Sequence, residues 1–115
     1  MLEKARRRYI LVKINGDKPV QEKDFQSTLW SSIIRLFGEY GASLTNISLI
    51  DYNINKRYVI VRCSHRELPM VRAALATITR IGEEEATAHV LLVSGTLRAL
   101  RRRMPKILPN EKDKT

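Results

Sequence analysis

The chain has 115 residues, of which 43% are hydrophobic, and it carries 21 Lys and Arg residues against 12 Asp and Glu residues. This length suits one domain with its own core, and the hydrophobic content excludes a disordered chain. No apolar run is long enough to span a membrane, and the basic N-terminus lacks the apolar segment of a signal peptide. One cysteine and two histidines argue against a disulfide and a protein zinc site, so we expect a cytoplasmic protein.

Periodicity in the first part of the chain predicts a strand, a helix and a second strand. The strand at 8–14 alternates, with Ile10, Val12 and Ile14 on one face and Tyr9, Leu11 and Lys13 on the other. After a short loop a helix begins near Gln21, and either Gly38 or Gly41 can supply the left-handed residue that ends it. Its expected buried stripe consists of Phe25, Leu29, Ile33, Leu36, Phe37 and Tyr40. The second strand is expected over 44–52.

The clearest strand of the chain is expected at 57–63. It places Val59, Val61 and Cys63 on one face and Tyr58, Ile60 and Arg62 on the other. The helix that follows has two candidate starts. Ser64 with Glu67 fits a capping box, whereas Pro69 favours a start near Leu68.

This second helix is expected to stop near Gly82, followed by a solvated turn at 83–85 and a fourth strand over 86–93. A last helix then runs to Met104 and is ended by Pro105. The element order predicts an α+β fold, a ferredoxin-like or RRM-like sandwich in which two helices cover a four-stranded antiparallel sheet, plus a C-terminal helix.

The second sheet face carries Tyr9, Leu11, Tyr58 and Ile60, which is too apolar to remain exposed. We expect the C-terminal helix, a partner or RNA bases to cover it. We divide the chain into a basic N-terminal extension at 1–7, a single α/β domain at 8–104 and a polar, flexible tail at 105–115.

The basic excess lies at the two ends of the chain. Residues 1–13 hold five basic residues against one acidic residue, and residues 94–109 hold five basic residues and no acidic one. The segment between them is neutral. Clustered Lys and Arg residues are typical of proteins that bind polyanions, although a solvated basic surface would look similar. The candidate binding residues are Arg6, Arg7, Arg8, Arg98, Arg101, Arg102, Arg103 and Lys106. This hypothesis requires both segments to meet on one surface.

Ser94, Gly95 and Thr96 precede the last helix and are expected to cap it. Backbone N–H groups, two hydroxyls and the positive end of the helix dipole also suit a phosphate oxygen. Arginine side chains nearby would pair with the same group. We therefore include these three residues in the candidate RNA site, while a plain cap with a solvated basic helix remains the alternative.

Three aromatic residues are candidates for a protein interface. Tyr9 and Tyr58 lie on the strands where RNA-recognition modules stack bases, but the segment 56–63 lacks the glycine and two aromatics of the ribonucleoprotein octamer. We expect both tyrosines to pack under a helix or a partner instead. Trp30 lies beside the buried stripe of its helix and either widens the core or anchors a partner.

No group of residues resembles a protein catalytic site. Cys63 and His65 are two residues apart, but Cys63 faces the core and His65 starts a helix, so we expect structural roles. His89 stands alone in a strand and is expected to pack or to contact the sheet edge. No carboxylate pair stands out, and the sequence has no glycine-rich nucleotide loop.

Several segments resemble the archaeal ribonuclease P protein component 2 family, which has a eukaryotic counterpart shared with the mitochondrial-RNA-processing ribonuclease. The resemblance covers residues 8–103, and its most specific part is Ser94-Gly95-Thr96-Leu97-Arg98. The other matching segments are Arg8-Tyr9-Ile10, Trp30, Phe37-Gly38-Glu39-Tyr40-Gly41-Ala42, Ile60-Val61-Arg62-Cys63 and the remainder of 93–102.

The resemblance implies an accessory subunit of an RNA-based endonuclease that removes 5′ leaders from precursor tRNA. In that enzyme the RNA subunit, with magnesium, carries the chemistry, so no catalytic residue or cofactor is expected in this chain. The implied partners are ribonuclease P RNA, precursor tRNA and a TIM-barrel-like protein subunit, with homodimerisation in a heterotetramer as an open option. A ribosomal or other RNA-scaffold protein and a small-molecule regulatory domain remain alternatives. The latter leaves the basic ends unexplained.

Overall fold

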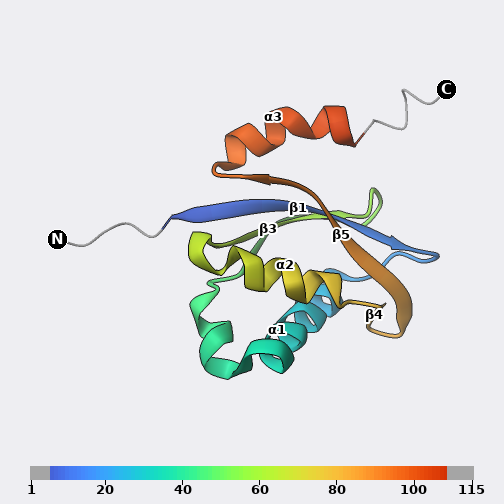
Figure 1. Ribbon diagram of the computed structural model, residues 1–115. Helices are drawn as coiled ribbons and strands as arrows, with labels where there is room; N and C mark the ends of the chain where they lie inside the picture. The colour runs from blue at the N-terminus through green and yellow to red at the C-terminus, as the bar shows by residue number, and fades with distance from the viewer. Residues whose placement is uncertain (1–5, 109–115) are drawn as a thin grey trace.

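The computed structural model describes residues 6–108, which form three layers with a sheet in the middle (Figure 1). The strands are β1 (Arg7–Gly16), β2 (Ser48–Asn53), β3 (Tyr58–Ser64), β4 (Arg80–Ile81) and β5 (Glu84–Ser94), in the spatial order β2-β3-β1-β5-β4. The helices are α1 (Glu22–Leu44), α2 (Leu68–Ala76) and α3 (Leu97–Ile107), with a short 3-10 turn, η1 (His65–Glu67), before α2. Helices α1 and α2 cover one face of the sheet, and α3 covers the other.

The predicted α+β sandwich and its element order are confirmed, but the strand count is wrong by one. Helix α2 ends at Ala76, well before Gly82, because the β-branched run Thr77-Ile78-Thr79 follows it. The strand β4 then turns back at Gly82, whose φ is +61°, and pairs with Glu84 and Glu85. Residues 83–85 are therefore part of a small hairpin and do not form a separate solvated turn.

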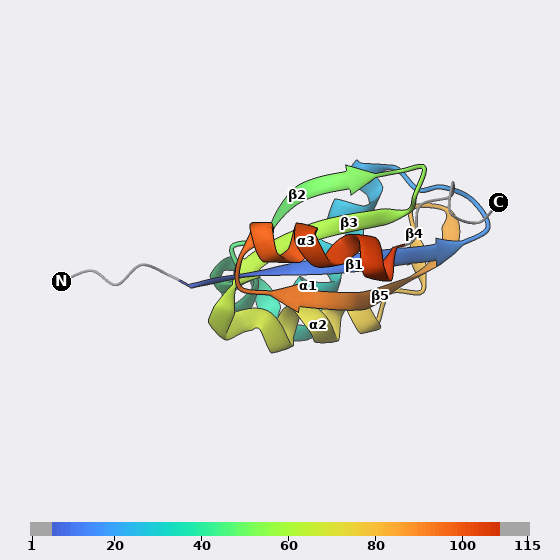
Figure 2. The same cartoon turned by 90° about the horizontal axis from the view of Figure 1, so that it is seen from above.

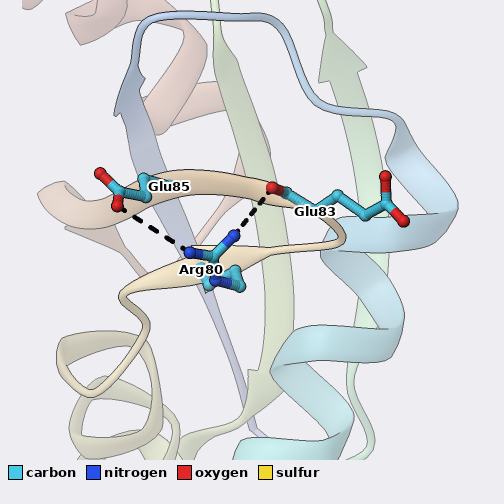
Figure 3. A network of polar contacts seen from close by, with 3 residues as sticks. All are labelled: Arg80, Glu83 and Glu85. Carbon is cyan, nitrogen blue, oxygen red and sulfur yellow. Dashed lines mark hydrogen bonds and ion pairs between the residues drawn. The ribbon is translucent and has the colours of Figure 1, made fainter.

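The side chain of Arg80 links the two arms of this hairpin (Figure 3). Its guanidinium donates a hydrogen bond to the carbonyl of Glu83 at 2.8 Å and forms an ion pair with Glu85 at 3.9 Å. Both charged side chains are exposed, so the ion pair contributes little to stability.

Two further boundaries differ from the predictions. Gly38 has the positive φ, +78°, of a residue that ends a helix, and its backbone is not helical; α1 breaks there, and a second helical segment continues to Leu44. The strand β2 consequently begins at Ser48. Helix α3 continues through Pro105 to Ile107, since a proline near the end of a helix removes only one backbone hydrogen bond. The parts of the predicted extension and tail at 1–5 and 109–115 lie outside the described residues.

Helix α2 starts at Leu68, the start that Pro69 favoured, and not at the capping box of Ser64. Ser64 makes no side-chain capping bond, and Pro69 lies in the first turn of a helix that starts at Leu68. The intervening 3-10 turn is tied to the sheet layer because the N–H of His65 donates to the carbonyl of Arg6 at 2.8 Å.

The predicted faces of β1 and β3 are confirmed by two separate cores. The larger core, between the sheet and α1 and α2, includes Ile10, Val12, Ile14, Val59, Val61 and Cys63. The smaller core, between the sheet and α3, consists of Leu11, Ile60, Leu92 and Leu100. Register shifts in β2 and β5 leave Ile50 and Leu91 unpaired and allow both to pack in this smaller core.

Candidate RNA interface

The structure brings the two basic segments together. Because β1 and β5 are antiparallel, the start of β1 lies beside the end of β5, and Tyr9 pairs with Ser94. A Cβ atom added at Gly95 would lie 3.4 Å from Nη1 of Arg8, so the turn into α3 passes directly over this arginine. Figure 2 shows the beginning of β1 and the turn before α3 at the same end of the sheet. The described part of both segments therefore contributes to one surface.

The turn before α3 is a helix cap, as predicted. The N–H of Ala99 donates to Oγ1 of Thr96 at 3.1 Å, and the N–H of Thr96 donates to Oγ of Ser94 at 3.3 Å. No hydrogen bond within residues 6–108 uses the N–H groups of Leu97 or Arg98. These groups and the positive end of the helix dipole are available to an anion.

Helix α3 has an apolar side and a basic side. Its apolar side chains pack on the sheet: Leu97, Leu100, Met104 and Ile107. On the opposite side, Arg98, Arg102 and Lys106 recur every four residues and are all exposed. Successive charges along this row are separated by a rise of about 6 Å. We call these three residues the α3 basic row.

The other arginines of α3 lie beside this row. Nη1 of Arg101 is 3.7 Å from Oδ2 of Asp51 on β2, and Arg103 is exposed. The ion pair is partly exposed and contributes little energy, but it holds Arg101 toward β2.

At the start of β1, Arg6 and Arg7 are exposed and Arg8 is half-buried. The Arg8 guanidinium donates to the carbonyl of Arg7 at 3.0 Å and so stays close to Gly95. The segments 6–13 and 94–108 contain no acidic residue. The interface consequently carries an excess of positive charge, with Arg101 alone among these arginines paired to a carboxylate, that of Asp51, within the described residues.

The three aromatic candidates do not come together. Tyr9 and Tyr58 are half-buried in the smaller core under α3, as the packing interpretation predicted. Trp30 lies on α1, in the layer on the other side of the sheet, and its exposed fraction is 42%. Tyr9 and Tyr58 therefore lie on the opposite side of the sheet from Trp30, and no single partner surface includes all three.

The second half of α1 shows a surface that the periodicity did not reveal. Phe25, Leu29 and Ile33 are buried as expected, but Leu36, Phe37 and Tyr40 of the predicted stripe are exposed. The kink at Gly38 redirects the helix, and Ala42 takes the buried position instead. All large hydrophobic residues that are exposed within 6–108 lie on α1, and we call them the α1 apolar surface: Trp30, Leu36, Phe37, Tyr40 and Leu44.

The cysteine and the two histidines lie in different environments. Cys63 is buried, and burial raises the pKa of its thiol to about 11, with a further increase from Glu67 and an opposing effect of Arg8. His65 is exposed, and Nε2 of the exposed His89 lies 3.1 Å from Oγ1 of Thr87.

Within 6–108 there is no group of three or more residues that could hold a metal ion. No helix in this range is long and apolar enough to cross a membrane.

The raised pKa of Cys63 predicts slow alkylation and alkaline sensitivity. At pH 8 we expect the folded chain to react with iodoacetamide at least about 100-fold more slowly than the chain in concentrated urea. The folded state favours the neutral thiol of Cys63. This preference stabilises the fold below pH 9, and the stabilisation is lost as the pH rises from 9 to about 11. Urea unfolding of the wild type and Cys63→Ala between pH 8 and 11 measures this loss. An equal decline in both proteins would assign the alkaline effect to another group, such as Tyr52, whose pKa burial raises to about 12.

Comparisons with known proteins agree with this fold. Residues 8–105 match the model of the Rpp14/Pop5 family. The chain is 34% identical over 95 residues to ribonuclease P protein component 2 of Methanosarcina mazei, which covers 83% of this chain and 80% of that protein. It is 28% identical over 96 residues to the protein of the same name from Pyrococcus horikoshii, with 84% and 80% covered.

A similar fold occurs in the cryo-EM structure of yeast ribonuclease MRP. The TM-score is 0.67 at 12% sequence identity, and the match covers 92% of this chain and 94% of that chain. At this identity the likeness concerns the fold alone. The family match, in contrast, extends over nearly all the described residues, and the segments that carry the resemblance fall within it. The chain therefore belongs to the Rpp14/Pop5 family.

Proposed function

We propose that this chain is an accessory protein subunit of ribonuclease P, acting in the cytoplasm, that binds the catalytic RNA and a second protein subunit and so supports removal of 5′ leaders from precursor tRNA. The observation that carries the proposal is the convergence on one surface of the two basic segments, 6–13 and 94–108, neither of which contains an acidic residue. The relatives named ribonuclease P protein component 2 support the assignment to this enzyme.

The RNA-binding part of the proposal uses α3 and the start of β1. The α3 basic row would contact successive phosphates, and the cap at Ser94–Thr96 would receive another phosphate at the helix N-terminus. Arg6, Arg7 and Arg8 extend this surface along β1, and Arg101 and Arg103 widen it. Because the tyrosines are packed under α3, the surface would recognise the RNA backbone and not stacked bases.

Magnesium, which the family's RNA-based chemistry implies, does not fit the residues of this surface. The donors here are guanidinium and ammonium groups, and the nearby carboxylate of Asp51 is paired with Arg101. Magnesium prefers oxygen ligands, so we propose that the ion is bound by the RNA subunit. The residues of this chain would hold the RNA in its active shape and perform no bond-breaking step.

The α1 apolar surface is the place we propose for a TIM-barrel-like protein subunit. Exposed clusters of large apolar side chains mark protein interfaces, and tryptophan and tyrosine contribute strongly to binding energy. Tyr40 is 78% exposed and Trp30 is 42% exposed. We place Tyr9 and Tyr58 outside this interface because α3 covers them. Homodimerisation within a heterotetramer is a further arrangement that this surface would allow.

Replacing Trp30 and Tyr40 by alanine is expected to weaken binding of the protein subunit by at least about 2 kcal/mol, since both side chains are interface anchors. The free energy of unfolding of the isolated chain should change little because both residues are exposed. Calorimetric titration with the purified subunit measures the affinity, and urea unfolding measures stability. Unchanged affinity in a variant that is fully folded would place the partner on another face.

Reconstitution of cleavage tests the proposed function directly. Ribonuclease P RNA and its other protein subunits are assembled with and without this chain, and cleavage of a precursor tRNA is measured at limiting magnesium. We expect a higher cleavage rate with the chain present, and no cleavage by the chain alone. An RNA-scaffold protein of another particle would bind RNA without raising the rate. Stabilisation by a nucleotide or an amino acid, with none by RNA, would instead indicate a small-molecule regulatory domain.

A further inference from the structure

The outer edge of β5 is open over much of its length. One edge of this strand pairs with β1 from Ala86 to Ser94, whereas the other pairs with β4 only at Glu84 and Glu85. Within residues 6–108, no strand covers the outer edge from Thr87 onward. Open edges are usually protected by charged residues, prolines or bulges. The stretch Thr87–Val90, which precedes the bulge, contains none of these.

A groove runs between this open edge and α2. Arg72, Leu75 and Ala76 of α2 form one wall, and residues 87–90 of β5 form the other. Its floor is apolar, because Leu75 and Ala88 are both buried there. A helix beside an open strand edge is the geometry in which an added peptide strand gains main-chain hydrogen bonds from the edge and places alternate side chains in the groove.

The positive charge of Arg72 at the rim of the groove favours an acidic partner. Arg72 and His89 are exposed, and Arg72 has no ion pair within the described part of the chain. Among residues 6–108, no acidic residue lines the groove. A second copy of this chain would bring its own Arg72 guanidinium against the same positively charged rim, which is unfavourable. Single-stranded RNA is disfavoured as well, since the groove offers no aromatic side chain for base stacking.

We propose that the groove between α2 and the outer edge of β5 binds an extended acidic peptide segment of a protein partner, which adds a strand beside Thr87–Val90. The groove is lined by α2, and Figure 1 shows that α2 and α3 lie on opposite sides of the sheet. Peptide binding at this site does not depend on the proposed RNA interface, and both sites can be occupied together.

The test selects peptides with the full chain from a displayed library of random sequences. We expect enriched peptides to alternate acidic with β-branched or other apolar residues. A synthetic representative should shift the amide resonances of residues 87–90 and slow their hydrogen exchange. Arg72→Glu should weaken its binding by about tenfold or more, because a charge-assisted contact is replaced by repulsion. Arg66→Glu makes the same charge change on η1, outside the groove, and should leave the affinity within about twofold.

Several results would overturn the proposal. The first is that no peptide is enriched, or that the enriched peptides bind Arg72→Glu and the wild type equally well while both proteins remain folded. The second is a dimer in sedimentation experiments that His89→Glu dissociates, which would give the groove to a second copy. The third is a larger loss of RNA affinity for Arg72→Glu than for Arg66→Glu, which would assign the groove to RNA.

Discussion

Replacing Arg98, Arg102 and Lys106 together by alanine is expected to weaken binding of ribonuclease P RNA by roughly 10- to 100-fold. The three side chains form the exposed row of α3 and lie opposite its buried side. With three phosphate contacts fewer, binding of the variant releases fewer counterions from the RNA. The slope of log affinity against log salt should therefore become less steep by about 3. Filter binding or fluorescence anisotropy over a salt series measures both quantities.

A charge-matched variant separates this effect from a general loss of positive charge. Lys18, Lys23 and Arg35 are also exposed, and they lie on α1 or on the loop before it. Replacing these three by alanine changes the net charge equally but should leave the affinity within about threefold and the salt slope nearly unchanged. Equal losses in the two triple variants would mean that the whole charge of the chain attracts RNA and that α3 forms no specific site. Urea unfolding should show both variants close to the wild type.

Leu100→Ala is expected to lower the free energy of unfolding by about 2–5 kcal/mol. Leu100 is the fully buried residue of α3 and meets Leu11, Ile60 and Leu92 in the smaller core. An isolated helix of this length is unstable in water, so α3 depends on this packing. Weaker packing should also disorder the α3 basic row and reduce RNA affinity. Urea unfolding and the RNA titration measure the two effects on the same protein.

The matched control for Leu100 is Leu75→Ala. Leu75 is buried to the same extent, but it lies in the larger core beside α2, on the other side of the sheet. This substitution should cause a comparable loss of stability and leave RNA affinity unchanged under conditions where the chain is folded. If Leu75→Ala and Leu100→Ala reduced RNA affinity to the same degree, the loss would reflect partial unfolding, and α3 would have no particular role in the RNA interface.

The faces of the strands were predictable because alternation is a local property. In β1, residues Ile10 and Val12 turn to α1 and α2, and Leu11 turns to α3, as the period of two requires. The cap at Thr96 was equally predictable, since it depends on one side chain and the N–H three residues later. The inward direction of Cys63 also followed from the alternation in β3, and the structure buries this residue.

Short or redirected elements were not predictable, because non-local contacts decide them. The two residues of β4 carry no periodic signal and become a strand only by pairing with β5. Tyr40 follows the kink at Gly38, which redirects the helix, and Leu36 lies in the last turn before it; helical periodicity counted both as core although the tertiary structure exposes them. The α1 apolar surface was missed for the same reason, and a glycine inside the predicted stripe was the one available signal.

By itself, the sequence determined that the positive charge is concentrated at two segments far apart in the chain. Only the tertiary structure decided that these segments share a surface. Antiparallel pairing of the first and last long strands places Tyr9 beside Ser94, and burial of Leu100 holds α3 over the sheet with its basic row outward. Charge composition is a property of residues one at a time, whereas a binding surface depends on pairing and packing between residues that are distant in the chain.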